Sequence, residues 1–241
     1  MLSVRNLSKI YPTPSGERAL FRDLSFDLER SERLAIFGRN GQGKSTLIKI
    51  LGGAIWPSSG RVDWSMESSW PIGFGGAFQG GLTGIDNIRF VSRIYNKPFE
   101  EIAAYTEGFA ELGEALLMPV KHYSTGMRAR LAFGLSLAIE FDCYLIDEVI
   151  AVGDASFQQK CQRELFGHRA DRAFIIASHD TAFLRQTCDR AIVIDRGRAK
   201  VFDDIDLAAD IYEAIGSRSE YEEQLAQKIM VQPLPAESVV G

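Results

Sequence analysis

The stretch Ala35–Thr46, AIFGRNGQGKST, constrains the fold of this chain more than any other segment. Four residues separate Gly38 from Gly43, and Lys44 and Ser45 follow, which matches the phosphate-binding loop pattern directly after an apolar run. Such a loop joins a buried strand to a helix, because backbone N–H groups and the positive end of the helix converge on phosphate. We therefore expect a strand, the loop and a helix in that order, with a nucleoside triphosphate as the ligand.

The loop assigns roles to individual residues. Lys44 would approach the β- and γ-phosphates, and the Ser45 hydroxyl would ligate Mg²⁺. The nucleotide would contact the whole loop, which consists of Gly38, Arg39, Asn40, Gly41, Gln42, Gly43, Lys44, Ser45 and Thr46. The alternative is a glycine-rich turn with a chance Lys-Ser pair. The loop predicts the ligand and does not indicate what the ligand is used for.

Composition limits the partners of the chain. The chain has 241 residues, of which 46% are hydrophobic, and a net charge of −5. A chain of this length can bury one core with an attached lobe. A negative net charge argues against nucleic acid as the main partner, because a basic surface is the usual sign of one. The longest stretch without charge, residues 68–85, contains six glycines, so we expect no membrane-spanning helix. Any transport channel would therefore belong to another chain.

The order of the predicted elements indicates an α/β fold. Residues 2–11 and 19–29 alternate apolar and polar positions, which predicts two antiparallel strands around a turn at 12–18. Further strands are predicted at 32–37, 141–147, 172–178 and 190–197, with an edge strand at 198–203. Helices are predicted at 44–53, 87–96, 99–117, 126–141 and 207–216. Alternating strands and helices predict a mostly parallel core sheet.

These elements form one expected domain over residues 1–216. It has an N-terminal antiparallel β layer and an inserted helical lobe at about 85–140. The remaining residues, 217–241, are expected to be a short tail.

Two further strand ends carry residues suited to phosphate chemistry. Asp147 ends an apolar run and could hold Mg²⁺, and Glu148 could orient and deprotonate an attacking water. His179 follows another apolar run and could bond the γ-phosphate. Acidic residues or a histidine after a strand also occur for structural reasons. The phosphate loop favours the catalytic interpretation, because it requires a metal partner on a neighbouring strand.

The segment YSTGM, residues 123–127, suggests a second anion site. Ser124, Thr125 and Gly126 open an amphipathic helix, whose first N–H groups and serine hydroxyl could bind phosphate. The alternative is a plain helix cap. Since the phosphate loop already holds the nucleotide, the segment would serve a nucleotide held by a second copy of the chain.

The order of the phosphate loop, YSTGM, LIDE and SHD resembles the nucleotide-binding subunit of ATP-binding-cassette (ABC) transporters over about residues 2–215. The resemblance implies the P-loop NTPase fold of ABC ATPases, with ATP and Mg²⁺ as cofactors. It implies that Tyr11 stacks on adenine, that Ser124 and Gly126 match the family signature and that Asp154 contacts the other subunit. Gln79 would be the glutamine that links Mg²⁺ to a membrane partner, although it lies closer to Leu82 than is usual in the family.

Segments such as GAFQGGLTGIDNIRF and EFDCYLIDEVIAVGD resemble the polysaccharide-export branch, and most of all the capsular polysaccharide export ATPases. This resemblance implies an ATP-sandwich homodimer that hydrolyses ATP at the cytoplasmic face of the bacterial inner membrane. The dimer would work with a transmembrane permease, which mainly contacts the polysaccharide.

Three alternative functions are compatible with the same sequence. The chain could serve another surface polysaccharide, such as O-antigen or teichoic acid. It could be an ABC ATPase that acts on DNA or ribosomes, or a module that binds ATP without hydrolysing it.

Overall fold

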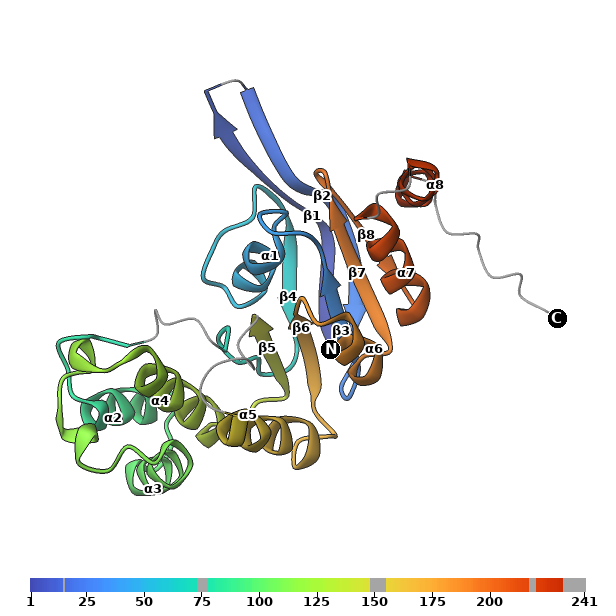
Figure 1. Ribbon diagram of the computed structural model, residues 1–241. Helices are drawn as coiled ribbons and strands as arrows, with labels where there is room; N and C mark the ends of the chain where they lie inside the picture. Colours follow the sequence, from blue (N-terminus) through green and yellow to red (C-terminus); the bar gives the residue numbers. More distant parts are fainter. Residues whose placement is uncertain (15, 73–77, 148–154, 217–219, 232–241) are drawn as a thin grey trace. The chain divides into compact units, whose positions relative to one another are not determined.

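The computed structural model describes residues 1–14, 16–72, 78–147, 155–216 and 220–231 (Figure 1). The chain forms two compact units. Unit 1 comprises Met1–Leu28, Glu32–Trp64 and Ile176–Gly241, and unit 2 comprises Glu29–Ser31 and Ser65–Ile175. Among the described residues, no helix has both the length and the apolar character that crossing a membrane requires.

Unit 1 begins with an antiparallel sheet in the order β2-β1-β4. Its strands are β1 Leu2–Thr13, β2 Gly16–Leu28 and β4 Ser59–Trp64. The predicted antiparallel layer is confirmed, but its expected turn at 12–18 is wrong. Residues 12, 13 and 16–18 belong to the strands. The connection is shorter than expected, and the hydroxyl of Thr13 donates across it to the carbonyl of Gly16 at 3.0 Å. The polar strand β4 has no buried residue, so its sequence lacks a strand signal.

A second, mixed sheet in unit 1 carries the phosphate loop. In it β3 Arg33–Phe37 pairs in parallel with β7 Arg190–Asp195, and β7 pairs antiparallel with β8 Arg198–Phe202. The helices of this unit are α1 Lys44–Leu51, α6 Thr181–Thr187, α7 Ile205–Ile215 and α8 Glu220–Val231. Helix α7 packs on the sheet, where Tyr212 stacks on Phe37 with ring centroids 5.3 Å apart.

Helix α8 lies within the predicted tail and packs on unit 1. Its residues Ala226 and Met230 are buried, and the amide of Gln227 donates to Asp195 at 2.7 Å. The sequence prediction missed this helix because the charged residues at its start outweigh the apolar pairs at 225–226 and 229–230, although these pairs have helical spacing.

Unit 2 contains the described helices that lie between β4 and β6 (Ala173–Ala177) in the chain. They are α2 Gly84–Ile94, α3 Phe99–Ala110, the 3-10 helices η2 Gly113–Leu117 and η3 Val120–His122, α4 Thr125–Ala138, α5 Ala155–Gln162 and the π-helical segment η5 Arg163–Gly167. The expected single helix at 99–117 is wrong. Helix α3 stops where Glu111 takes a left-handed conformation with φ 54°, and residues 113–117 form η2.

The strand β5 Cys143–Asp147 runs through the core of unit 2, and β6 Ala173–Ala177 begins there. Aromatic rings pack around β5. Tyr144 stacks on Phe174 with centroids 5.6 Å apart, and Phe141 meets Trp70 and Tyr95 edge-on. This packing fixes the position of the strand that ends at Asp147.

Candidate nucleotide site

The phosphate loop leads from β3 into α1 with a backbone that suits an anion. Gly43 has φ 118°, and a Cβ on it would lie 3.0 Å from the Cβ of Leu20, so only glycine fits there. No side chain caps α1 at Gly43, and no acidic residue lies in its first turn. By contrast, a side chain caps each of the helices α2, α4, α6 and α7, and α3, which also lacks such a cap, carries two acidic residues in its first turn. The start of α1 is therefore arranged for an external anion.

Lys44 brings a positive charge to this loop. Its side chain is buried, with 4% of the residue exposed, and its ammonium donates a hydrogen bond to the carbonyl of Gly38 at 2.6 Å. A buried ammonium carries a desolvation cost that an anionic ligand would offset. The contact of Lys44 with phosphate stays a prediction.

The β1–β2 hairpin presents one face to the phosphate loop. Tyr11 pairs with Arg18 across the hairpin, so both side chains lie on the same face. From that face Arg18 donates to the carbonyl of Gly41 at 3.0 Å, and Leu20 lies against Gly43. The ring of Tyr11, the predicted adenine platform, is partly exposed and lies 4.8 Å from the ammonium of Lys9. Unit 1 thus brings Tyr11, Arg18 and the loop together.

Sequence reasoning missed Arg18, because a basic residue on an exposed strand carries no motif. We expect Arg18→Met to weaken ATP binding about 3- to 10-fold, the effect of losing one hydrogen bond and a nearby positive charge. Isothermal titration calorimetry with ATP measures this change. The matched control is Arg22→Met, since Arg22 lies on the same strand and forms only a long contact to Glu17 at 3.9 Å among the ion pairs of the described residues. Equal affinities for the two variants would contradict the role of Arg18.

The other predicted residue of unit 1 is His179. It lies exposed in the connection between β6 and α6. This connection is held by Asp180, whose N–H donates to Ser178 and whose carboxylate accepts from the N–H of Phe183. The position of His179 after a strand is confirmed, and its contact with a γ-phosphate stays a prediction.

Unit 2 holds the remaining described candidates. Asp147 is the last residue of β5. Ser124 caps α4, accepting from the N–H of Met127 at 3.2 Å, and Thr125 and Gly126 form the first turn. Because the hydroxyl of Ser124 accepts this bond, its own proton can be donated elsewhere. Glu148 and Asp154, two of the predicted residues, lie outside the described part of the chain.

Gln79 is exposed, and its backbone is fixed by a buried asparagine. Asn87 is 1% exposed; its side chain accepts from the N–H of Gln79 at 3.0 Å and donates to the carbonyls of Gln79 and Thr83. These bonds hold the segment before α2 in a defined conformation. They fix the backbone of Gln79, and its contact with Mg²⁺ stays a prediction.

Comparison with known families agrees with this arrangement. A family model described as ABC transporter matches residues 21–151, from the β1–β2 hairpin past the end of β5. The chain belongs to the ABC transporter family. It carries the ATPase domain of that family, as the order of its motifs predicted.

Its relatives within the ABC transporter family are similar over nearly their whole length. The chain is 52% identical to the capsule polysaccharide export ATP-binding protein CtrD of Neisseria meningitidis serogroup B, over 89% of this chain and 100% of that protein. It is 49% identical to the ATP-binding protein BexA of Haemophilus influenzae, over 88% of this chain and 98% of that protein. The polysialic acid transport ATP-binding protein KpsT of Escherichia coli is 46% identical, over 80% of this chain and 87% of that protein.

Solved structures share the fold at lower identity. An ATP-binding subunit of an ABC transporter is 21% identical and matches with a TM-score of 0.73, covering 96% of this chain and 100% of that chain. A dimeric ATP-binding cassette in a post-hydrolysis state with ADP and phosphate is 17% identical and matches with a TM-score of 0.72, covering 84% of this chain and 98% of that chain. These matches confirm the predicted ABC ATPase fold.

Proposed function

We propose that this chain is the ATP-hydrolysing subunit of an exporter that moves capsular polysaccharide across the bacterial inner membrane. The observation that supports this proposal most directly is the 52% identity to a capsule polysaccharide export protein along that protein's entire length. The ABC family membership accounts for the use of ATP, and the relatives suggest the polymer.

In this proposal Lys44 offsets phosphate charge, Glu148 orients and deprotonates the attacking water, and His179 bonds the γ-phosphate. Mg²⁺ would be held by oxygen ligands from Ser45, Asp147 and Gln79, the donor type that this cation prefers, and would neutralise phosphate charge. Ser124 and Gly126 of one copy would contact the nucleotide of a second copy. Two identical sites then form by two-fold symmetry.

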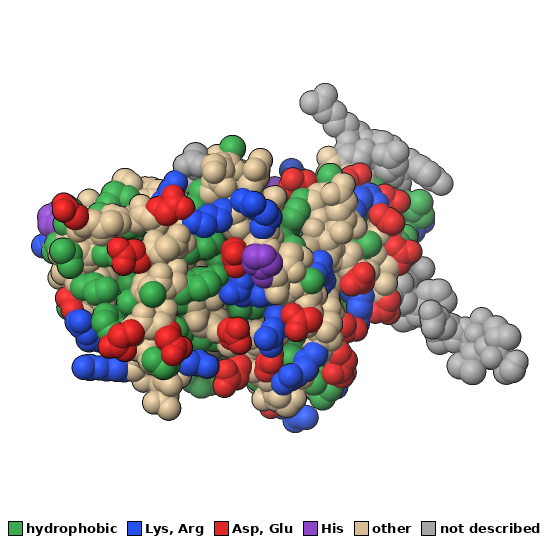
Figure 2. All heavy atoms as spheres, turned by 90° about the horizontal axis from the view of Figure 1, so that it is seen from below, with side chains coloured by type: hydrophobic (Ala, Val, Ile, Leu, Met, Phe, Trp, Pro, Cys, Tyr) green, Lys and Arg blue, Asp and Glu red, His purple; other side chains and the backbone are tan. Residues whose placement is uncertain are grey.

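The transport path would belong to a separate permease, which holds this subunit at the cytoplasmic face of the membrane. Exposed hydrophobic side chains on α2 and η2 suit such a partner: Phe90 is 51% exposed, Ile94 60% and Leu117 69%. On the face seen in Figure 2, basic side chains are interspersed with acidic ones, whereas nucleic-acid-binding proteins usually gather basic side chains in one patch.

Deleting the gene in its own organism tests the polymer. We expect capsule to disappear from the cell surface and to accumulate inside the cell, as measured by immunostaining before and after permeabilisation. The wild-type gene should restore surface capsule, and Lys44→Met should not. Normal capsule together with loss of O-antigen or teichoic acid would instead support the alternative exporters.

A further inference from the structure

The end of helix α4 lacks the usual devices that terminate a helix. Its last turn contains no basic residue, and Ile139 follows in an extended conformation with ψ 124° in place of a glycine. The last carbonyls of a helix have no partner within it and carry partial negative charge. Here the carbonyl of Leu137 accepts a hydrogen bond from Arg169 at 2.8 Å. A residue more than thirty positions away therefore caps the helix that begins at Ser124.

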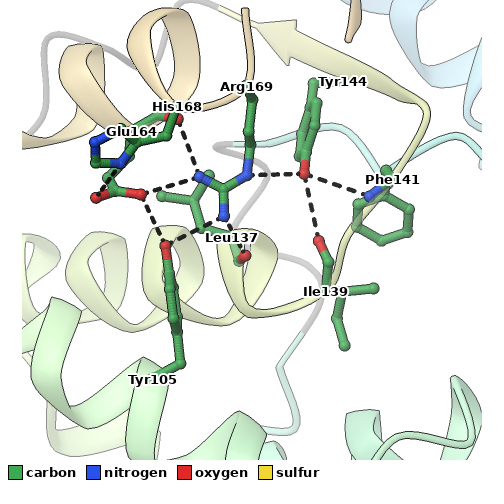
Figure 3. A network of polar contacts seen from close by, with 8 residues as sticks. All are labelled: Tyr105, Leu137, Ile139, Phe141, Tyr144, Glu164, His168 and Arg169. Atoms are coloured by element: carbon green, nitrogen blue, oxygen red, sulfur yellow. Dashed lines mark hydrogen bonds and ion pairs between the residues drawn. The ribbon is translucent and has the colours of Figure 1, made fainter. Parts of the chain in front are cut away.

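Arg169 lies at the centre of a hydrogen-bond network inside unit 2 (Figure 3). Its side chain is 13% exposed. Its guanidinium group donates five hydrogen bonds, as many as it has N–H groups. The acceptors are the hydroxyls of Tyr105 and Tyr144, the carbonyls of Leu137 and Glu164, and the carboxylate of Glu164. The network joins α3, α4, β5 and η5.

Tyr144 extends this network into the connection between α4 and β5. The hydroxyl of Tyr144 accepts from Arg169 at 3.1 Å and from the N–H of Phe141 at 3.3 Å, and it donates to the carbonyl of Ile139 at 3.5 Å. One hydroxyl thus closes the short segment between the end of α4 and the start of β5. Tyr144 itself is 1% exposed and lies in the aromatic core, so its position is fixed.

The charge of Arg169 is balanced by Glu164. Partial burial opposes ionisation of Glu164, but hydrogen bonds from Arg169, Tyr105 and His168 outweigh it and lower the pKa of this carboxyl below its ordinary value. A buried charge with a hydrogen-bonded partner is stable, whereas either group alone would carry a large desolvation cost. The network is therefore an integral part of unit 2 at neutral pH.

We propose that Arg169 is a positioning residue for ATP hydrolysis, which fixes the direction of α4 relative to the strand that ends at Asp147. This inference rests on the proposed role of Ser124 toward the nucleotide of a second copy. Helix α4 has 14 residues and is about 20 Å long, so a tilt of about 3° at its capped end moves Ser124 by about 1 Å. Displacements of that size cost about 100-fold in rate when they misalign reacting groups.

The proposal predicts a separation of binding from hydrolysis. The phosphate loop belongs to unit 1 and Arg169 to unit 2. Loss of Arg169 should therefore leave nucleotide binding to a single subunit unchanged, while the rate falls. Loss of a residue that only stabilised the fold would lower ATP binding and the rate of hydrolysis together.

The experiment compares Arg169→Met, Arg169→Lys and the control Arg172→Met in the full chain. Arg172 lines the same cleft as Arg169 but forms ion pairs with Glu140, Asp142 and Asp171. We expect kcat for ATP to fall about 10-fold or more in Arg169→Met, with the Kd for ATP within about 2-fold of wild type. Arg169→Lys keeps the charge and loses the forked geometry, so its kcat should be intermediate. Arg172→Met should match wild type.

Thermal unfolding is measured for each variant, and kcat is taken at a temperature where the protein remains folded. If Arg169→Met does not fold, then Arg169→Lys and Tyr105→Phe decide, since each removes only part of the network. Wild-type kcat in the folded variants would overturn the proposal, as would a loss of ATP affinity equal to the loss of kcat. If the wild-type chain did not hydrolyse ATP, the proposed function itself would be wrong. If the wild type is active and the Arg169 variants are equally active, only the positioning role of Arg169 is wrong.

Discussion

Lys44→Met should weaken ATP binding by at least about 100-fold, or roughly 3 kcal/mol, because it removes a charged donor from the phosphate loop. Lys44 is buried and its ammonium donates to the carbonyl of Gly38, so its position in the loop is fixed. Glu148→Gln should have the opposite profile, with ATP affinity retained and hydrolysis reduced by about 100-fold or more. Calorimetry with ATP and steady-state release of phosphate separate the two effects.

Lys49→Met is the control for Lys44, since both lysines lie on α1 and Lys49 is in its last turn, away from the loop. We expect this variant to bind ATP within about 2-fold of wild type, because Lys49 lies at the end of α1 opposite to the loop. Equal ATPase activity in Lys44→Met and wild type would refute the assigned role. If the Glu148→Gln protein also stayed monomeric in ATP, the proposed homodimer would be wrong.

The phosphate loop could be predicted because its chemistry is local. A run of apolar residues, glycines at set positions and a Lys-Ser pair specify strand, loop and helix within a dozen residues. The same holds for β5 and α4, where a buried strand ends at Asp147 and a serine caps a helix. Here the information lies in neighbouring residues.

Arg18, Asn87 and Arg169 could not be found in this way. Each acts through partners that the fold brings near, such as Gly41 for Arg18 and Leu137 for Arg169. A lone arginine or asparagine has many uses, and only its acceptors distinguish them. The strand β4 was missed for a related reason, since its pairing with β1 and not an apolar pattern defines it.

Gly84→Ala should destabilise unit 2 by about 2 kcal/mol, because the added methyl group has no room. A Cβ at Gly84 would overlap the hydroxyl of Tyr123 and lie 2.9 Å from the Cδ2 of Leu116. The hydroxyl of Tyr123 cannot easily move, since it donates to the carbonyl of Ala115 at 2.6 Å. A lowering of Tm by about 4–8 °C would measure this loss.

The clash should also affect hydrolysis, because Tyr123 directly precedes Ser124, the cap of α4. Gly81→Ala is the matched control: Gly81 lies three residues earlier, in the loop before α2, and a Cβ there meets no atom within 4 Å. Its stability should stay within about 0.5 kcal/mol of wild type. Tyr123→Phe removes the overlapping oxygen, so in the Gly84→Ala protein it should restore part of the lost stability, although alone it should cost about 1 kcal/mol. If the stability losses of the two substitutions simply add in the double variant, the added methyl group does not contact the hydroxyl of Tyr123. In that case the substitution at Gly84 places no strain on the segment at residues 123–127.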